Sequence, residues 1–289
     1  MNLNKIVLGT VQFGLSYGIN NTGGKPTQDQ VNKILLEAFR SGIRCLDTAE
    51  VYGNAHKIIG DFHEKYPMYE FDIITKLPHD LTGRLDSRIS KYLNELKVQA
   101  LAGLLFHSYD SYKKNKHEFE VISKLKKEGV LKNLGVSVYT NDQAMDVLDD
   151  DLIDVIQLPF NLLDNFSQRE KVLINAKKRG KTVHTRSAFL QGVFFCSVGE
   201  EKNIIKLLKE ELKGIHEISA RNNISIQKLA LNYCLQQPLI DRVLIGVDNL
   251  TQLKQNINDS AYVLPDIILS EINKIKTKNV DLLNPSLWK

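Results

Sequence analysis

The sequence predicts a (β/α)8 barrel, the TIM barrel fold, formed by a single domain over residues 1–289. Short apolar segments alternate with amphipathic helical segments along the whole chain, which is the pattern of a parallel sheet covered by helices. There are eight such apolar segments, the number that closes a barrel. An open, doubly wound sheet is the competing fold, but the chain lacks the Gly-x-Gly-x-x-Gly turn that usually holds a dinucleotide there.

Each predicted strand is short and apolar, as strands buried on both faces are, and each is bounded by Gly, Pro, Asp or a charged residue. In chain order, the predicted strands are Lys5–Thr10, Cys45–Asp47, Phe71–Lys76, Gly103–His107, Leu134–Val138, Val155–Leu158, Thr182–Ser187 and Val243–Gly246. Most gaps between them leave room for one helix. The gap before the last strand is longer, so we expect an extra helix near the C-terminus, within Glu200–Arg221.

The helices between the strands are marked by apolar residues three and four apart and by signals at their ends. The first begins at Thr27, which Gln30 follows three residues later as in a capping box, and it is followed by Gly42. The clearest predicted helices are Thr27–Ser41, Arg88–Lys97, Phe119–Lys127 and Gln227–Leu235.

Composition and charge are those of an ordinary globular protein, with 43% hydrophobic and 25% charged residues. The net charge of +4 is a mild excess of 38 basic over 34 acidic residues. The densest basic runs are Lys113–Lys116, Lys124–Lys127 and Lys177–Lys181. They carry no interleaved aromatic residues, so we interpret them as solvated faces and expect no nucleic-acid partner.

The cysteines indicate a reducing compartment. Cys45, Cys196 and Cys234 are odd in number and lack Cys-x-x-Cys spacing, which argues against a disulfide framework and against a metal site. The N-terminal segment lacks the basic stretch followed by a long apolar stretch that marks a signal peptide. No apolar stretch approaches the ~20 residues of a membrane-spanning helix. We therefore expect a cytoplasmic protein with no membrane association.

Polar residues stand at the ends of three successive predicted strands, where barrel enzymes build their active sites. Asp47, Lys76 and His107 end strands two, three and four, and Tyr52 follows Asp47 in the next loop. A buried lysine needs a counter-charge, which Asp47 would supply. An ammonium near a phenol would lower the pKa of Tyr52 and make it a proton donor, while His107 would hydrogen-bond a substrate oxygen. We expect these four groups to converge on one carbonyl.

Each of these residues, taken singly, is more often structural. A strand-end Asp–Lys pair commonly serves the fold, a loop tyrosine usually packs, and a lone histidine is usually a satisfied core residue. The four together, on neighbouring strand ends, favour chemistry over packing.

The segment Gly42–Gly53, with Asp47-Thr-Ala and then Tyr52-Gly53, resembles the N-terminal signature of the aldo-keto reductase superfamily. The resemblance extends over nearly the whole chain. The other matching segments are Leu8–Gly14, Ile74–Lys76, Leu104–His107, Gly135–Ser137, Gln157–Asn161, Ser187–Gly192, and Ile245-Gly246 with Gln252, Leu253 and Asn256.

The resemblance implies an NAD(P)-dependent oxidoreductase that reduces an aldehyde, ketone or sugar carbonyl to an alcohol, or runs the reverse reaction. Tyr52 would be the general acid, Lys76 would depress its pKa, Asp47 would pair with Lys76, and His107 would orient the carbonyl oxygen. The cofactor would be NADP or NAD.

The resemblance also implies a set of cofactor-binding residues. Ser137 and Gln157 would bind the nicotinamide carboxamide, and Asp47 would lie beside them. The remaining members are Gly9, Thr10, Arg186, Ser187, Phe189 and Gln191 along the cofactor trench, and Gly246, Gln252, Gln255 and Asn256 around the adenosine end.

Three positions depart from the family pattern. Val138 follows Ser137 where the family often has Asn, so one carboxamide contact is in doubt. Arg186 stands where a tyrosine often stacks on the nicotinamide; it would stack there, reach a substrate anion, or pair with a nearby acid. The phosphate segment contains Asp248 and no cation, with Lys254 the nearest, so we expect a weakened preference for NADP and use of NAD.

The substrate is less well defined by the sequence, because loops form the pocket walls. The candidate wall residues are Phe13, Tyr17, Tyr109, Tyr139, Phe160 and Trp288, and a loop with Phe194 and Phe195 would close over the cofactor or contact another subunit. Two other functions remain open: a cofactor-binding regulatory subunit with little turnover, and a barrel isomerase or lyase without redox chemistry. The complete Asp–Tyr–Lys–His set favours the enzyme.

Overall fold

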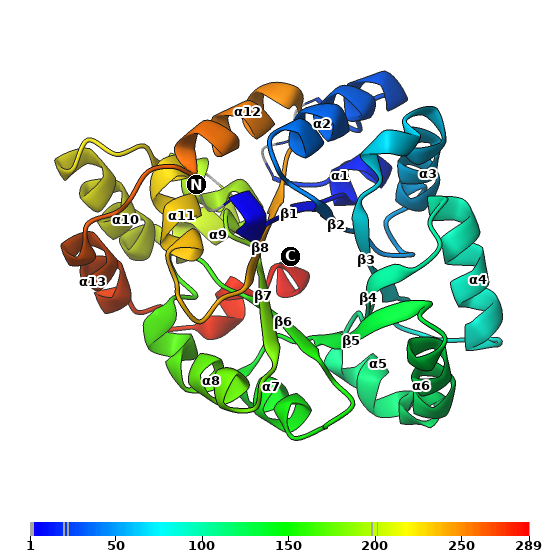
Figure 1. Ribbon diagram of the computed structural model, residues 1–289. Helices are drawn as coiled ribbons and strands as arrows, with labels where there is room; N and C mark the ends of the chain where they lie inside the picture. Colours follow the sequence, from blue (N-terminus) through cyan, green and yellow to red (C-terminus); the bar gives the residue numbers. More distant parts are fainter. Residues whose placement is uncertain (1–2, 20, 22, 198, 201, 289) are drawn as a thin grey trace.

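The computed structural model describes the chain except residues 1–2, 20, 22, 198, 201 and 289. Its eight strands pair in parallel and in chain order, and β1 pairs with β8, so the sheet closes into a barrel. Figure 1 looks along this barrel, with the strands in the middle and the helices around them. The predicted (β/α)8 fold is therefore confirmed. The strands are β1 Ile6–Gly9, β2 Cys45–Asp47, β3 Asp72–Leu77, β4 Leu101–Phe106, β5 Leu131–Ser137, β6 Val155–Pro159, β7 Thr182–Arg186 and β8 Arg242–Gly246.

The predicted strands differ from the observed ones mainly at their first residues. Strand β4 begins at Leu101 because Leu101 pairs with Leu131, the first residue of β5. The small residues Ala102 and Gly103 interrupt the apolar run there, which hid the start of β4 in the sequence. At the other end, β4 stops at Phe106, so His107 lies just beyond the strand.

The predicted helices are present with shifts of a few residues at their ends. Helix α2 has both hydrogen bonds of the capping box between Thr27 and Gln30. Helices α9 and α10 fall in the segment where an extra helix was predicted. The helices are α1 Val11–Gly14, α2 Gln28–Arg40, α3 Ala55–Lys65, α4 Leu85–Leu96, α5 Tyr109–Lys114, α6 Phe119–Lys127, α7 Asn141–Leu148, α8 Phe166–Lys178, α9 Asn203–Leu207, α10 Lys209–Arg221, α11 Ile226–Leu235, α12 Leu250–Asp259 and α13 Asp266–Lys274.

The barrel interior is filled by its own layer of side chains, separate from the larger core between strands and helices. This layer consists of Val7, Cys45, Ile74, Leu105 and Leu244. Side chains two residues apart on a strand point to the same face. Two residues beyond members of the layer, toward the carboxyl ends of their strands, stand Gly9, Asp47, Lys76, His107 and Gly246. The apolar layer thus forms the floor below a polar layer.

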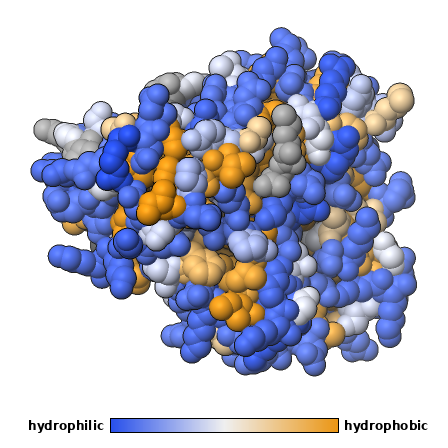
Figure 2. Space-filling model, turned by 60° about the vertical axis from the view of Figure 1, so that its left-hand side comes forward, coloured by the Kyte–Doolittle hydropathy of each residue, from blue (hydrophilic) through white to orange (hydrophobic). Residues whose placement is uncertain are grey.

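The outer surface is mostly hydrophilic. Figure 2 shows the side that carries α10 and α13, where smaller hydrophobic areas lie between polar side chains. Within the described part of the chain, no helix is both long enough and apolar enough to cross a lipid bilayer.

Candidate active site

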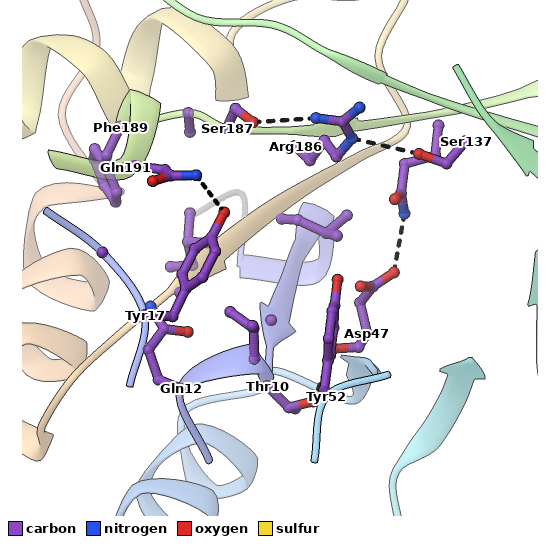
Figure 3. A pocket seen from close by; sticks show the side chains of 18 of the residues that line it. Thr10, Gln12, Tyr17, Asp47, Tyr52, Ser137, Arg186, Ser187, Phe189 and Gln191 are labelled. Atoms are coloured by element: carbon purple, nitrogen blue, oxygen red, sulfur yellow. Dashed lines mark hydrogen bonds between the residues drawn. The ribbon is translucent and has the colours of Figure 1, made fainter. Parts of the chain in front are cut away.

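A cavity of about 860 Å³ opens at the carboxyl ends of the strands. Its wall brings together nearly all of the predicted site residues, from strand ends that are far apart in the sequence (Figure 3). Gln255 is the exception: its side chain donates a hydrogen bond to Asp259 on its own helix, at 3.0 Å, and it is not part of the wall. The predicted residues that line the cavity are Gly9, Thr10, Asp47, Tyr52, Lys76, His107, Ser137, Gln157, Arg186, Ser187, Phe189, Gln191, Gly246, Gln252 and Asn256.

A buried ion pair forms the base of the cavity. The Lys76 ammonium bonds to one carboxylate oxygen of Asp47 and donates to the carbonyl oxygen of Thr48 at 3.2 Å. The other Asp47 oxygen accepts a hydrogen bond from the Gln157 amide at 2.9 Å. Lys76 and Asp47 are 2% and 3% exposed. Burial lowers the pKa of Lys76, and the Asp47 carboxylate opposes that change.

Tyr52 lies above this pair. The Lys76 nitrogen is 5.4 Å from the centre of the Tyr52 ring. Burial is the main cause that raises the pKa of the phenol, and the Asp47 carboxylate raises it further. The predicted lowering of this pKa by Lys76 is therefore wrong for this structure. The physical reason is that burial and the Asp47 carboxylate disfavour the phenolate more than the nearby positive charge of Arg186 favours it.

A glycine allows Tyr52 to occupy its position. Gly14 ends helix α1 directly against the Tyr52 turn, and a Cβ atom there would lie 1.7 Å from the Tyr52 carbonyl oxygen. No other residue type fits this contact without moving the backbone. Gly14, the last residue of the matching segment Leu8–Gly14, is thus needed because the two loops approach each other closely here.

His107 completes the group. Its ring meets the Tyr52 ring edge-on at 5.7 Å between centres, and on another side it stacks on His79 at 4.9 Å. Burial, with a contribution from the Lys76 charge, lowers the pKa of His107 to about 2. The imidazole is therefore neutral at physiological pH, and its Nδ1 is buried without a hydrogen-bond partner. The four predicted catalytic side chains thus share one wall of the cavity.

Arg186 points into the cavity from the end of β7. Its guanidinium lies 4.1 Å from the centre of the Tyr139 ring. It donates long hydrogen bonds of 3.4 Å to Ser137 Oγ, Ser187 Oγ and the Val138 carbonyl oxygen. The proposed pairing of Arg186 with a nearby acid has no counterpart among the ion pairs of the described residues.

Two loops meet over the cavity. The amide of Gln191 donates to the hydroxyl of Tyr17 at 2.8 Å (Figure 3), and the Ile19 amide donates to the Gln191 carbonyl oxygen at 3.2 Å. The Gln191 loop turns sharply: Ser187 and Gln191 have φ angles of 64° and 54°, in the left-handed region. Phe189 and Phe195 line the cavity in this loop, while Phe194 is buried in the core.

The end of the cavity near β8 is lined by backbone and amide groups. Gly246 lies against the Gln12 side chain, and a Cβ there would be 2.5 Å from the Gln12 amide nitrogen, so the Gln12 side chain would have to move. Gln252 donates to Asp248 at 3.1 Å. Lys254 lies 3.7 Å from Glu37 on α2 and does not line the cavity. Lys76 and Arg186 are the only Lys or Arg side chains among the described wall residues.

Some predicted wall residues are placed elsewhere. Tyr17, Tyr109 and Tyr139 line the cavity, but Phe13 and Phe160 are fully buried in the core, because their apolar rings pack beneath the loops. Trp288 is likewise outside the wall and donates to the Leu282 carbonyl oxygen at 2.9 Å. Several lining residues were not predicted from the sequence. Gln12 lies within the matching segment Leu8–Gly14 but was not singled out, and the others belong to no motif: Asn21, His79, Ser108, Asp110, Gln143, Gln227 and Ser286. For Gln12 and His79, their place just after strand ends was a usable signal.

Residues 5–277 match the model of the aldo/keto reductase family. A D-threo-aldose 1-dehydrogenase of Pseudomonas sp. is 22% identical over 89% of this chain and 92% of its own. An L-galactose dehydrogenase of Arabidopsis thaliana is 26% identical over 86% and 82%. An aldo-keto reductase of Bacillus halodurans, solved in its holo form, superposes with a TM-score of 0.77 at 20% identity, covering 94% of this chain and 91% of its own. The chain therefore belongs to the aldo/keto reductase family.

Proposed function

We propose that this oxidoreductase reduces the carbonyl group of an aldehyde, ketone or sugar to an alcohol with a nicotinamide cofactor. The observation that carries the proposal is the convergence of Tyr52, His107 and the Lys76–Asp47 pair on one wall of a cavity large enough for a cofactor and a substrate. A cofactor-binding protein without turnover would not need all four groups.

Tyr52 is the proposed general acid. Because its pKa is raised, the phenol keeps its proton at neutral pH and is a donor. A carbonyl oxygen that becomes an alkoxide is more basic than a phenolate, so the proton moves from the Tyr52 hydroxyl to that oxygen. Lys76 holds a positive charge below the ring, which stabilises the phenolate that results.

His107 orients the carbonyl. A neutral imidazole donates one N–H and does not compete with Tyr52 for proton transfer. Its stacking on His79 and its edge contact with Tyr52 fix the ring plane. The carbonyl oxygen is thereby held between two donors, which is the positioning that hydride transfer requires.

The cavity suits a nicotinamide dinucleotide, which would supply the hydride. The Gln157 side-chain oxygen is buried without a partner, and Gln12 offers a second such oxygen. An unpaired buried acceptor is costly and is satisfied when a carboxamide N–H donates to it. We assign Gln157 and Ser137 to the carboxamide, Gly9, Thr10, Ser187, Phe189 and Gln191 to the trench, and Gly246, Gln252 and Asn256 to the adenosine end.

We propose NAD as the preferred cofactor. A 2′-phosphate needs Lys or Arg donors for strong charge-assisted bonds. The described wall near β8 offers Asp248 and amides instead, and Lys254 faces Glu37. Asp248 would repel the phosphate.

The test combines binding and turnover. The purified protein is titrated with NADH and with NADPH by fluorescence, and each reduced cofactor is then incubated with a panel of small aldehydes, ketones and sugars. We expect tighter binding of NADH and loss of reduced-cofactor absorbance with at least one carbonyl compound. Binding without turnover across the panel would support a regulatory subunit, and absence of binding would refute a nicotinamide site.

A further inference from the structure

Arg186 carries a charge that no acidic group of the described structure balances. Two buried acids, Asp47 in the cavity wall and Asp164, each have their own cation. Asp47 pairs with Lys76, and Asp164 accepts two hydrogen bonds from Arg169, at 2.6 and 2.7 Å. Arg186 has no ion pair of its own and is only partly exposed, at the end of β7. A half-buried cation at a cavity wall is stabilised when an anion joins it.

The guanidinium is also held in a fixed plane with donors to spare. One of its faces packs on the Tyr139 ring, which limits its rotation. Its three hydrogen bonds, all of 3.4 Å, go to neutral oxygens. A guanidinium has five N–H donors in a planar fork that matches carboxylate and phosphate oxygens. Arg186 is thus a preformed receptor for an anionic oxygen group.

The position of Arg186 decides which ligand supplies that group. Arg186 lines the same cavity as Tyr52 and His107, and its hydrogen bonds reach Ser137 and Val138 at the end of β5, so it lies at the part of the cavity that holds the proposed reacting carbonyl. The end near Gly246, assigned to the adenosine part of the cofactor, is formed by β8 and α12 instead. An oxidised nicotinamide ring is itself cationic, so it would be repelled by an unbalanced arginine nearby. A substrate anion removes this repulsion.

We propose that Arg186 binds a carboxylate or phosphate group of the substrate, so that this enzyme acts on anionic carbonyl compounds. This inference rests on the proposed function, because it concerns the substrate of the same site. It adds a charge requirement that the four catalytic groups do not impose.

The experiment compares matched substrates that differ in charge. The pairs are succinic semialdehyde with butyraldehyde, glyoxylate with methylglyoxal, and glyceraldehyde 3-phosphate with glyceraldehyde, each measured with NADH. For the preferred pair we expect the kcat/KM ratio of the anionic over the neutral compound to exceed about 10. Arg186→Gln should reduce this ratio about 10- to 100-fold, and Arg186→Lys should retain part of it.

Arg179→Gln serves as the matched control, since Arg179 pairs with Asp149 at 2.6 Å outside the cavity wall. It should leave the ratio as in the wild type. The proposal is overturned if all three ratios are near 1, or if Arg186→Gln weakens NADH binding without changing the ratio, which would assign Arg186 to the cofactor. Turnover of neutral aldehydes alone overturns this inference and leaves the proposed function intact, whereas failure of every carbonyl compound overturns the function itself.

Discussion

The Asp47–Lys76 pair allows the stability of the site to be tested apart from its activity. Asp47→Asn removes the counter-charge and leaves the Lys76 ammonium, 2% exposed, with only neutral acceptors, among them the Thr48 carbonyl oxygen. Loss of one partner of a buried ion pair costs about 3–5 kcal/mol in the free energy of unfolding. For comparison, Lys57→Met breaks the Lys57–Asp61 pair on α3, whose side chains are 74% and 41% exposed, and should cost about 0.5 kcal/mol or less.

The cost in Asp47→Asn should depend on pH, with a sign that follows from the pKa of Lys76. Burial lowers that pKa, and Asp47 opposes the lowering, so removal of Asp47 lowers it further. In the folded variant the lysine then releases its proton within a range of pH where the unfolded chain still holds it, up to about pH 10.4. The unfolded state binds more protons there, so stability rises with pH. The deficit of Asp47→Asn should therefore shrink between about pH 6 and pH 9.

The assay is urea denaturation followed by circular dichroism, at both pH values, in a double-mutant cycle with Lys76→Met. The double variant Asp47→Asn/Lys76→Met carries neither charge, so its loss of stability should be well below the sum of the single losses. Additive losses, each under about 1 kcal/mol, would show that the pair is not a coupled buried charge pair and would refute this account.

Three further predictions concern the catalytic wall. Tyr52→Phe removes the proton donor and should lower kcat for carbonyl reduction by about 100-fold or more, with NADH affinity retained in a fluorescence titration; equal kcat would exclude Tyr52 as the acid. Because burial raises the pKa of Tyr52, reduction should be nearly constant between about pH 6 and pH 9, while alcohol oxidation, which needs the phenolate, should rise with pH; opposite slopes in the pH profiles of kcat/KM would contradict this. Gly14→Ala places a methyl group 1.7 Å from the Tyr52 carbonyl oxygen and should lower both Tm and kcat. The control variant, Gly214→Ala in α10, meets no atom within 4 Å and should stabilise the protein by up to about 1 kcal/mol. If Gly14→Ala left Tm and kcat unchanged, the two loops would not be in fixed contact.

Glu50 offers another test of how Tyr52 is positioned. Glu50 lies in the Tyr52 loop, accepts two hydrogen bonds of 2.6 Å from Arg88 on α4, and also bonds to the buried Tyr92. Glu50→Gln should lower kcat more than it changes KM, since the neutral amide weakens the bonds that anchor the loop while the substrate wall stays in place. An unchanged kcat, measured with thermal stability as the control, would show that the anchor has no role in catalysis.

The sequence by itself determined the fold and the core of the site. Strand period, helix caps and Gly or Pro boundaries are local signals, so β2, α2 and α6 were located closely. The strand-end rule then placed Asp47, Lys76 and His107 together, because barrel closure fixes where the carboxyl ends of neighbouring strands lie. The start of β4 was missed because it depends on pairing with β5.

Only the tertiary structure decided how these groups behave. The pKa of Tyr52 rises because burial and the Asp47 carboxylate outweigh the charge of Arg186, and burial is set by loops that pack from several parts of the chain. The same packing placed Phe13 and Phe160 in the core, turned Gln255 toward Asp259, and left Arg186 on Tyr139 without an acid. Side-chain environment is a long-range property, and a local pattern of residues cannot determine which charges end up paired.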